Sequence, residues 1–186
     1  MPPSGPQWVS QFPTSDSTNT LQEPFRTNVN RFIAALTAAG APPRDLTTFR
    51  PPQRAYLMHY SYRIANQGLD PQTVPPMAGV AIDWVHRNPN GTVNLAASRL
   101  AAQQMVQAYG IAYPPVLMSR HEEGRAIDMT ISWTGTLNIV NGSGTAVTIN
   151  TLPRNGAQNT SLHQVGASYG VLKLVADPPH WSTDGH

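Results

Sequence analysis

The stretch Ser119-Arg-His-Glu-Glu-Gly-Arg-Ala-Ile-Asp128 contains two residues that form a chemical set with a distant third. His121 and Asp128 combine with His180, near the C-terminal end, to give two imidazoles and one carboxylate. This ligand set suits one Zn²⁺ ion with a fourth coordination position left for water. The sequence therefore predicts that two distant segments meet at one metal ion.

The spacing between His121 and Asp128 excludes a helix between them. Seven residues of α-helix rise about 10 Å, too far for two ligands that each lie about 2 Å from one metal. We expect a loop that carries His121, turns at Gly124 and enters a strand near Ala126. His180 is then expected at the end of a neighbouring strand.

Asp177 lies three residues before His180. A carboxylate there is placed to act as the general base for a water molecule at the metal. One alternative is that Asp177 only caps a turn before Pro178-Pro179. The corresponding alternative for the three ligands is an ordinary cluster of polar side chains.

Composition limits the classes of protein to which the chain can belong. At 186 residues it is long enough for one domain with a real core. The 18 prolines and 14 glycines predict a loop-rich chain with short elements. There are no cysteines, so any metal must be bound by histidines and carboxylates.

Charge and hydropathy argue against two kinds of partner. The net charge is +2, Lys173 is the only lysine and no basic run exists, so we expect no nucleic-acid partner. No apolar run is long enough to span a membrane. The N-terminus lacks the layout of a secretory signal, so we expect a trimmed chain or a route out of the cytoplasm that needs no such signal.

Hydrophobic periodicity and capping residues predict the elements. Residues 1–23 are expected to form an N-terminal arm or linker, and residues 24–186 are expected to form one domain. Helices are expected after Phe25, after Arg50 and over 95–109, where Leu100 and Met105 should face inward. Strands are expected at 126–133, 136–140, 145–149 and 171–176, with a helix over 160–169 and a loop over 70–89. This order favours an α+β fold.

The two segments together resemble the zinc D,D- and L,D-peptidases of peptidoglycan, which include D-alanyl-D-alanine carboxypeptidases and dipeptidases and L-alanyl-D-glutamate endolysins. The resemblance is strong over residues 117–181 and loose elsewhere. It implies the Hedgehog/D,D-peptidase fold, a small antiparallel sheet with packed helices. The first segment matches Ser-x-His-x-x-Gly-x-Ala-x-Asp, and the second matches at Asp177, His180 and Trp181.

The resemblance also implies roles for single residues. His121, Asp128 and His180 would bind one zinc ion, and Asp177 would be the catalytic base, although many members of the family have Glu there. An arginine at the start of an upstream helix stabilises the tetrahedral intermediate in this family. Arg50 is the best match, with Arg54 as the second choice. The substrate would contact Ser119 and Trp181.

The expected function is hydrolysis of an amide bond in the stem peptide of peptidoglycan, by a monomer that acts in the periplasm or on the cell wall. The setting resembles a phage lysis enzyme or a toxin delivered between bacteria, and a toxin would have an inhibitor protein as partner. Two alternatives stay open. One is a non-catalytic, zinc-stabilised binding module of the same fold, and the other is a zinc peptidase with a non-wall peptide as substrate.

Overall fold

The computed structural model describes residues 1–186, which divide into two compact units. Unit 1 consists of Met1–Pro13 and Pro51–Ser119, and unit 2 consists of Thr14–Arg50 and Arg120–His186. The arm expected at residues 1–23 is therefore shared between the two units. The expected domain boundary at residue 24 stays a prediction. No helix in either unit has the length and apolar character that crossing a membrane requires.

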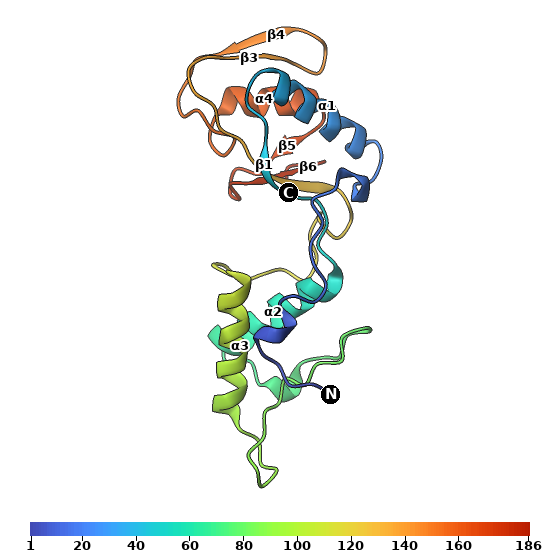
Figure 1. The fold of residues 1–186 in the computed structure, drawn as a ribbon, viewed down its shortest axis with the longest axis vertical. Helices are drawn as coiled ribbons and strands as arrows, with labels where there is room; N and C mark the ends of the chain where they lie inside the picture. The colour runs from blue at the N-terminus through green and yellow to red at the C-terminus, as the bar shows by residue number, and fades with distance from the viewer. The chain divides into compact units, whose positions relative to one another are not determined.

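Unit 1 is built around the helices α2 (Pro52–Asn66) and α3 (Leu95–Tyr109), which pack against each other (Figure 1). Short 3₁₀ helices, η1 (Pro6–Trp8) and η3 (Pro71–Thr73), complete the unit. Asn94 caps α3, because its side chain accepts a hydrogen bond from the Ala97 amide. The largest buried side chains of this unit are Trp8, Tyr56, Leu57, Tyr60, Ile64, Ile82, Trp84 and Met105.

The buried face of α3 differs from the prediction. Leu100 was expected to face inward but is 57 % exposed, whereas Met105 is buried as expected. The helix buries a stripe of small residues next to Met105 instead, because small side chains let two helix axes approach closely. This stripe consists of Ser98, Ala101 and Ala102.

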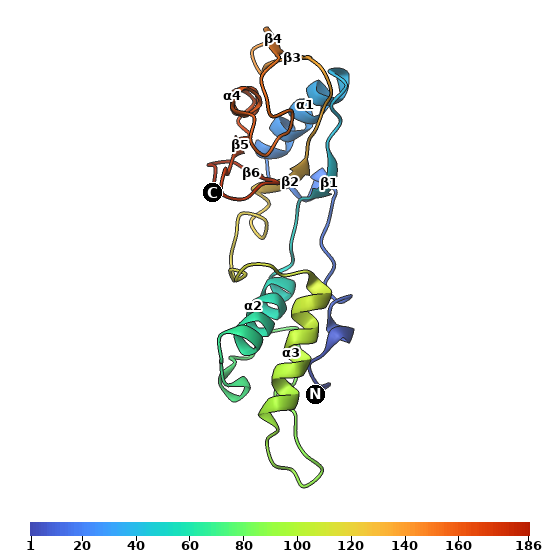
Figure 2. The ribbon, with the colours of Figure 1, turned by 90° about the vertical axis from the view of Figure 1, so that its left-hand side faces the viewer.

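Unit 2 contains the α+β fold that the sequence predicts. Its four-stranded antiparallel sheet has the order β1-β2-β6-β5, and a separate two-stranded hairpin pairs β3 with β4. Figure 2 shows α1 and α4 on the same side of the four-stranded sheet. The elements are η2 (Thr18–Thr20), α1 (Phe25–Ala38), β1 (Arg44–Thr47), β2 (Ala126–Thr130), β3 (Leu137–Val140), β4 (Ala146–Ile149), α4 (Thr160–Ser168), β5 (Leu172–Lys173) and β6 (His180–Ser182).

The core of unit 2 lies between the helices and one face of the sheet. Along β2, Ile127 and Met129 are buried in this core, and side chains alternate between the faces of a strand. Asp128 therefore points to the opposite face. On β6, Trp181 enters the core and contacts Phe32 of α1, with ring centroids 5.5 Å apart.

Two expected strands are shorter than the sequence suggested. The strand expected over 126–133 ends at Thr130, and the one expected over 171–176 is only the two-residue β5. The chain turns directly after Lys173, and backbone hydrogen bonds from Asp177 to Leu174 and from His180 to Asp177 close that turn. His180 consequently begins a strand of its own.

Candidate metal centre

Register in the sheet brings Asp128 and His180 together. They are direct cross-strand partners in the antiparallel pair β2–β6. Paired residues project from the same face of a sheet and lie about 5 Å apart. The neighbouring pair, Ile127 and Trp181, projects into the core, so the hydrophobic pattern of both strands fixes the face on which the polar pair lies.

A tight turn places His121 beside this pair. Gly124 has φ +67°, its amide donates to the His121 carbonyl, and the Arg125 amide donates to the Arg120 carbonyl. The chain therefore folds back just before β2, as the sequence predicted. His121 is 1 % exposed, so its imidazole is held at a buried position next to the first strand residues.

The three side chains converge on one point. His121 Nε2 lies 3.1 Å from Asp128 Oδ1 and 3.2 Å from His180 Nδ1, and His180 Nδ1 lies 3.3 Å from Asp128 Oδ1. A tetrahedral zinc ion with bonds of about 2.0–2.1 Å separates neighbouring ligand atoms by roughly 3.3–3.4 Å. The three atoms thus form one face of such a tetrahedron, and this group could hold a metal ion.

The electrostatics of the group favour an anionic carboxylate. Burial raises the pKa of Asp128, but hydrogen bonds and the attraction of His121 and His180 outweigh burial, so its pKa lies well below the ordinary value. An ionised carboxylate together with neutral imidazoles is the protonation state that binds divalent zinc.

Asp177, the expected base, lies outside this group of three ligands. It is exposed on the turn between β5 and β6, where its backbone takes part in the turn hydrogen bonds. The turn therefore uses the backbone of Asp177. The capping role of its side chain and its catalytic role both stay predictions.

Arg50 is bound to a residue of the motif. Its Nε lies 3.7 Å from Oε1 of Glu122, the neighbour of His121. The side chain of Glu122 is only 8 % exposed. The guanidinium of Arg50 compensates for the burial of this carboxylate.

Of the two residues expected to contact substrate, one is buried and the other is partly exposed. Trp181 is completely buried in the core of unit 2. It is the neighbour of His180 on β6, and its contact with substrate stays a prediction. Ser119 is partly exposed and is the last residue of unit 1, whereas the three ligands belong to unit 2.

Lys173 is a residue of the site that sequence reasoning missed. Its Nζ donates to the Asp177 carbonyl at 2.6 Å, to the His180 carbonyl at 3.1 Å and to the Leu174 carbonyl. Burial outweighs the attraction of Asp177 and Asp128, so the pKa of Lys173 lies below its ordinary value. The sequence carried one signal for it, because Lys173 is the only lysine of the chain and lies four residues before Asp177.

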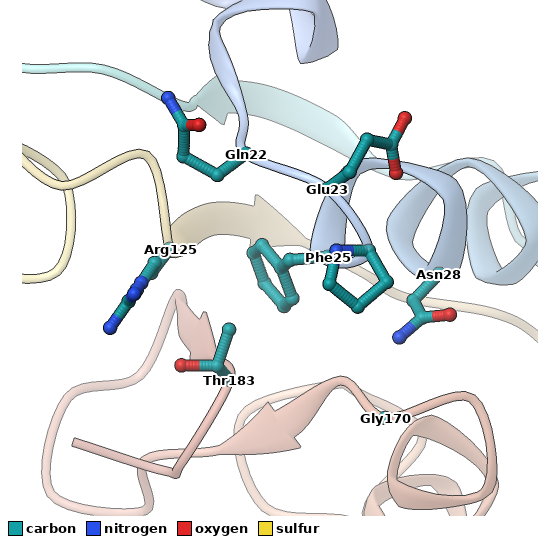
Figure 3. A pocket seen from close by; sticks show the side chains of 8 residues that line it. Gln22, Glu23, Phe25, Asn28, Arg125, Gly170 and Thr183 are labelled. Carbon is teal, nitrogen blue, oxygen red and sulfur yellow. The ribbon is translucent and has the colours of Figure 1, made fainter.

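A separate pocket of about 550 Å³ lies where α1 begins (Figure 3). None of its lining residues is a candidate ligand. They are Gln22, Glu23, Pro24, Phe25, Asn28, Arg125, Gly170 and Thr183.

Comparison with known proteins does not place the chain in a family, since no family model, curated protein or solved structure matches it. The geometry of the three ligands is therefore the basis for assigning a function.

Proposed function

We propose that the chain is a zinc-dependent peptidase that hydrolyses an amide bond in the stem peptide of peptidoglycan. The observation that carries this proposal is the triangle of His121 Nε2, Asp128 Oδ1 and His180 Nδ1, with sides of 3.1–3.3 Å. Two nitrogen donors and one oxygen donor favour zinc over magnesium or calcium, which prefer oxygen donors alone. The choice of substrate follows from the motif resemblance.

When bound, zinc acts as a Lewis acid that lowers the pKa of water and polarises a carbonyl group. Asp177 accepts the proton of the attacking water and returns it to the leaving amine. Its place on the exposed turn between β5 and β6 gives it access to solvent.

Arg50 stabilises the negative charge that develops on the carbonyl oxygen. Its guanidinium has five N–H donors, and the ion pair with Glu122 is made by Nε. Losing one such donor typically costs about 10²–10³ in rate.

The second candidate function is a non-catalytic, metal-stabilised binding module. One observation favours it, namely that Asp177 is exposed on a turn and is not one of the three converging side chains. Both candidates require the metal, so the role of Asp177 distinguishes them.

The test combines metal analysis with cleavage of defined muropeptides, in which new termini are identified by mass spectrometry. We expect His121→Ala to lose metal and activity together. Asp177→Asn should keep the metal and lose activity, whereas Asp16→Asn, at another exposed carboxylate of unit 2, should change neither.

Two results would contradict the peptidase. Zinc-loaded protein that cleaves no stem peptide would support the binding module instead. Cleavage at the normal rate by Asp177→Asn would show that another group acts as base.

A further inference from the structure

The second ring nitrogen of His180 has a specific partner. His180 Nδ1 belongs to the ligand triangle, and Nε2 lies 3.1 Å from the main-chain oxygen of His186. A main-chain oxygen can only accept a hydrogen bond, so Nε2 carries the proton. In the neutral imidazole this leaves the lone pair on Nδ1, the atom that faces the metal position.

The main chain of His186 is held by a compact turn that follows β6. Ser182 Oγ accepts hydrogen bonds from the Gly185 amide at 2.8 Å and from the His186 amide at 3.0 Å. Asp184 Oδ1 accepts from Ser182 Oγ and from the His186 amide, both at 3.3 Å. Ser182 is fully buried, and it projects from the same face of β6 as His180 because the two residues are two positions apart.

An ion pair connects this turn to the loop that carries the first ligand. Arg120 Nη2 lies 2.6 Å from Asp184 Oδ2, and Arg120 Nε donates to the same oxygen at 3.1 Å. Arg120 directly precedes His121 and also pairs with Glu123 at 2.9 Å. Both partners of the Arg120–Asp184 pair are more than a third exposed, and ion pairs at the surface contribute little to stability. The pair therefore has more influence on geometry than on stability.

We infer that residues 182–186 form an outer layer of the metal centre, in which Ser182 and Asp184 are positioning residues that fix His180 in the Nε2–H tautomer. Through Arg120, the same layer sets the position of the His121 loop relative to His180. This inference rests on the metal centre of the proposed function and specifies how the chain prepares it.

The test measures two quantities in purified protein. The first is the dissociation constant for Zn²⁺, obtained by competition with a chelating dye. The second is the tautomer of His180 in metal-free protein, read from ¹⁵N chemical shifts of the imidazole at a pH well above the ordinary histidine pKa of about 6.5.

We expect Ser182→Ala and Asp184→Asn each to weaken zinc binding by roughly 10- to 100-fold, the usual effect of losing an outer partner of a metal ligand. The His180 signals should change from the Nε2–H form to a mixture of tautomers. His186→Ala should change neither quantity, because the acceptor is a main-chain oxygen and stays in place when the side chain is removed. Arg26→Gln, which removes another exposed ion pair of unit 2, is the matched control and should also change neither.

The inference is overturned if folded Asp184→Asn and Ser182→Ala bind zinc as tightly as the parent protein and keep the Nε2–H tautomer. It is also overturned if His186→Ala weakens binding as much as Ser182→Ala does. Asp184 is at the surface, so its variant keeps the test valid even if Ser182→Ala does not fold. If the parent protein binds no zinc, the proposed function fails, while the tautomer still tests the positioning role by itself.

Discussion

At the scale of the residue, Gly124 shows why the motif contains a glycine between its ligands. Its φ of +67° is in the left-handed region that other residues avoid. A Cβ atom there would also lie 2.8 Å from the Thr20 carbonyl oxygen, and the Gly124 carbonyl accepts a hydrogen bond from the Gln22 amide. Two independent constraints, conformation and close backbone approach, therefore meet at one position.

The chain offers a matched pair of glycines to separate these constraints. Gly135 has nearly the same φ of +69°, but a Cβ atom there would meet nothing within 4 Å. Gly135→Ala should therefore cost only the conformational term of about 1–2 kcal/mol. Gly124→Ala should cost a further ~1–3 kcal/mol of overpacking and weaken zinc binding. Urea denaturation and zinc titration measure both effects, and equal costs for the two variants would contradict the close approach.

At the scale of the element, the packing of α4 against β6 fixes the strand that carries His180. Gly166 on α4 faces Trp181, and a Cβ atom at this glycine would lie 2.6 Å from the indole ring and 2.9 Å from the Val171 carbonyl oxygen. His163, on the same helix, contacts the indole edge to face. The distance between helix and sheet is therefore set by a residue without a side chain.

We expect Gly166→Ala to destabilise unit 2 by about 1–3 kcal/mol, because overpacking exceeds the gain of about 1 kcal/mol in helix propensity. Zinc binding should weaken as well, since a displaced Trp181 moves the adjacent His180. Gln164→Ala, at an exposed position of the same helix, should be neutral or slightly stabilising. Thermal denaturation with zinc titration checks this, and a stabilised Gly166→Ala would show that α4 can move away from the sheet.

The elements also show what the sequence could predict. Capping and periodicity predicted α1, α2, α3 and the β3–β4 hairpin, because these signals are local. The prediction of the buried face of α3 was wrong, because the large apolar side chain of Leu100 is a stronger signal in the sequence than the small residues that the helix buries. The outer layer of the metal centre was missed because the Arg120–Asp184 contact joins residues that no local pattern relates.

At the scale of the whole molecule, each unit is assembled from two separate stretches of chain, so the backbone passes between the units three times, after Pro13, Arg50 and Ser119. Each unit has its own hydrophobic core. The three candidate ligands lie within unit 2 alone, so metal binding should act on the stability of that unit.

Hydrogen exchange can test this localisation. A ligand at 100 times its Kd stabilises the state that binds it by about 2.7 kcal/mol, and amides exchange through local and subglobal opening. Adding zinc should therefore slow exchange in peptides that contain β2 and β6, and leave those from α2 and α3 unchanged. Equal slowing in both units would show that they unfold as one, and no slowing in β2 and β6 would argue against a metal there.

The single lysine has a consequence for chemical labelling. An acylating reagent finds only one ε-amino group in this chain, and that group donates to three carbonyl oxygens of the turn between β5 and β6. Its acylation requires these contacts to open, so the rate of modification reports how often the turn opens. Lys173 is thus a built-in probe of the segment that joins Asp177 to His180, and no foreign label is needed to follow it.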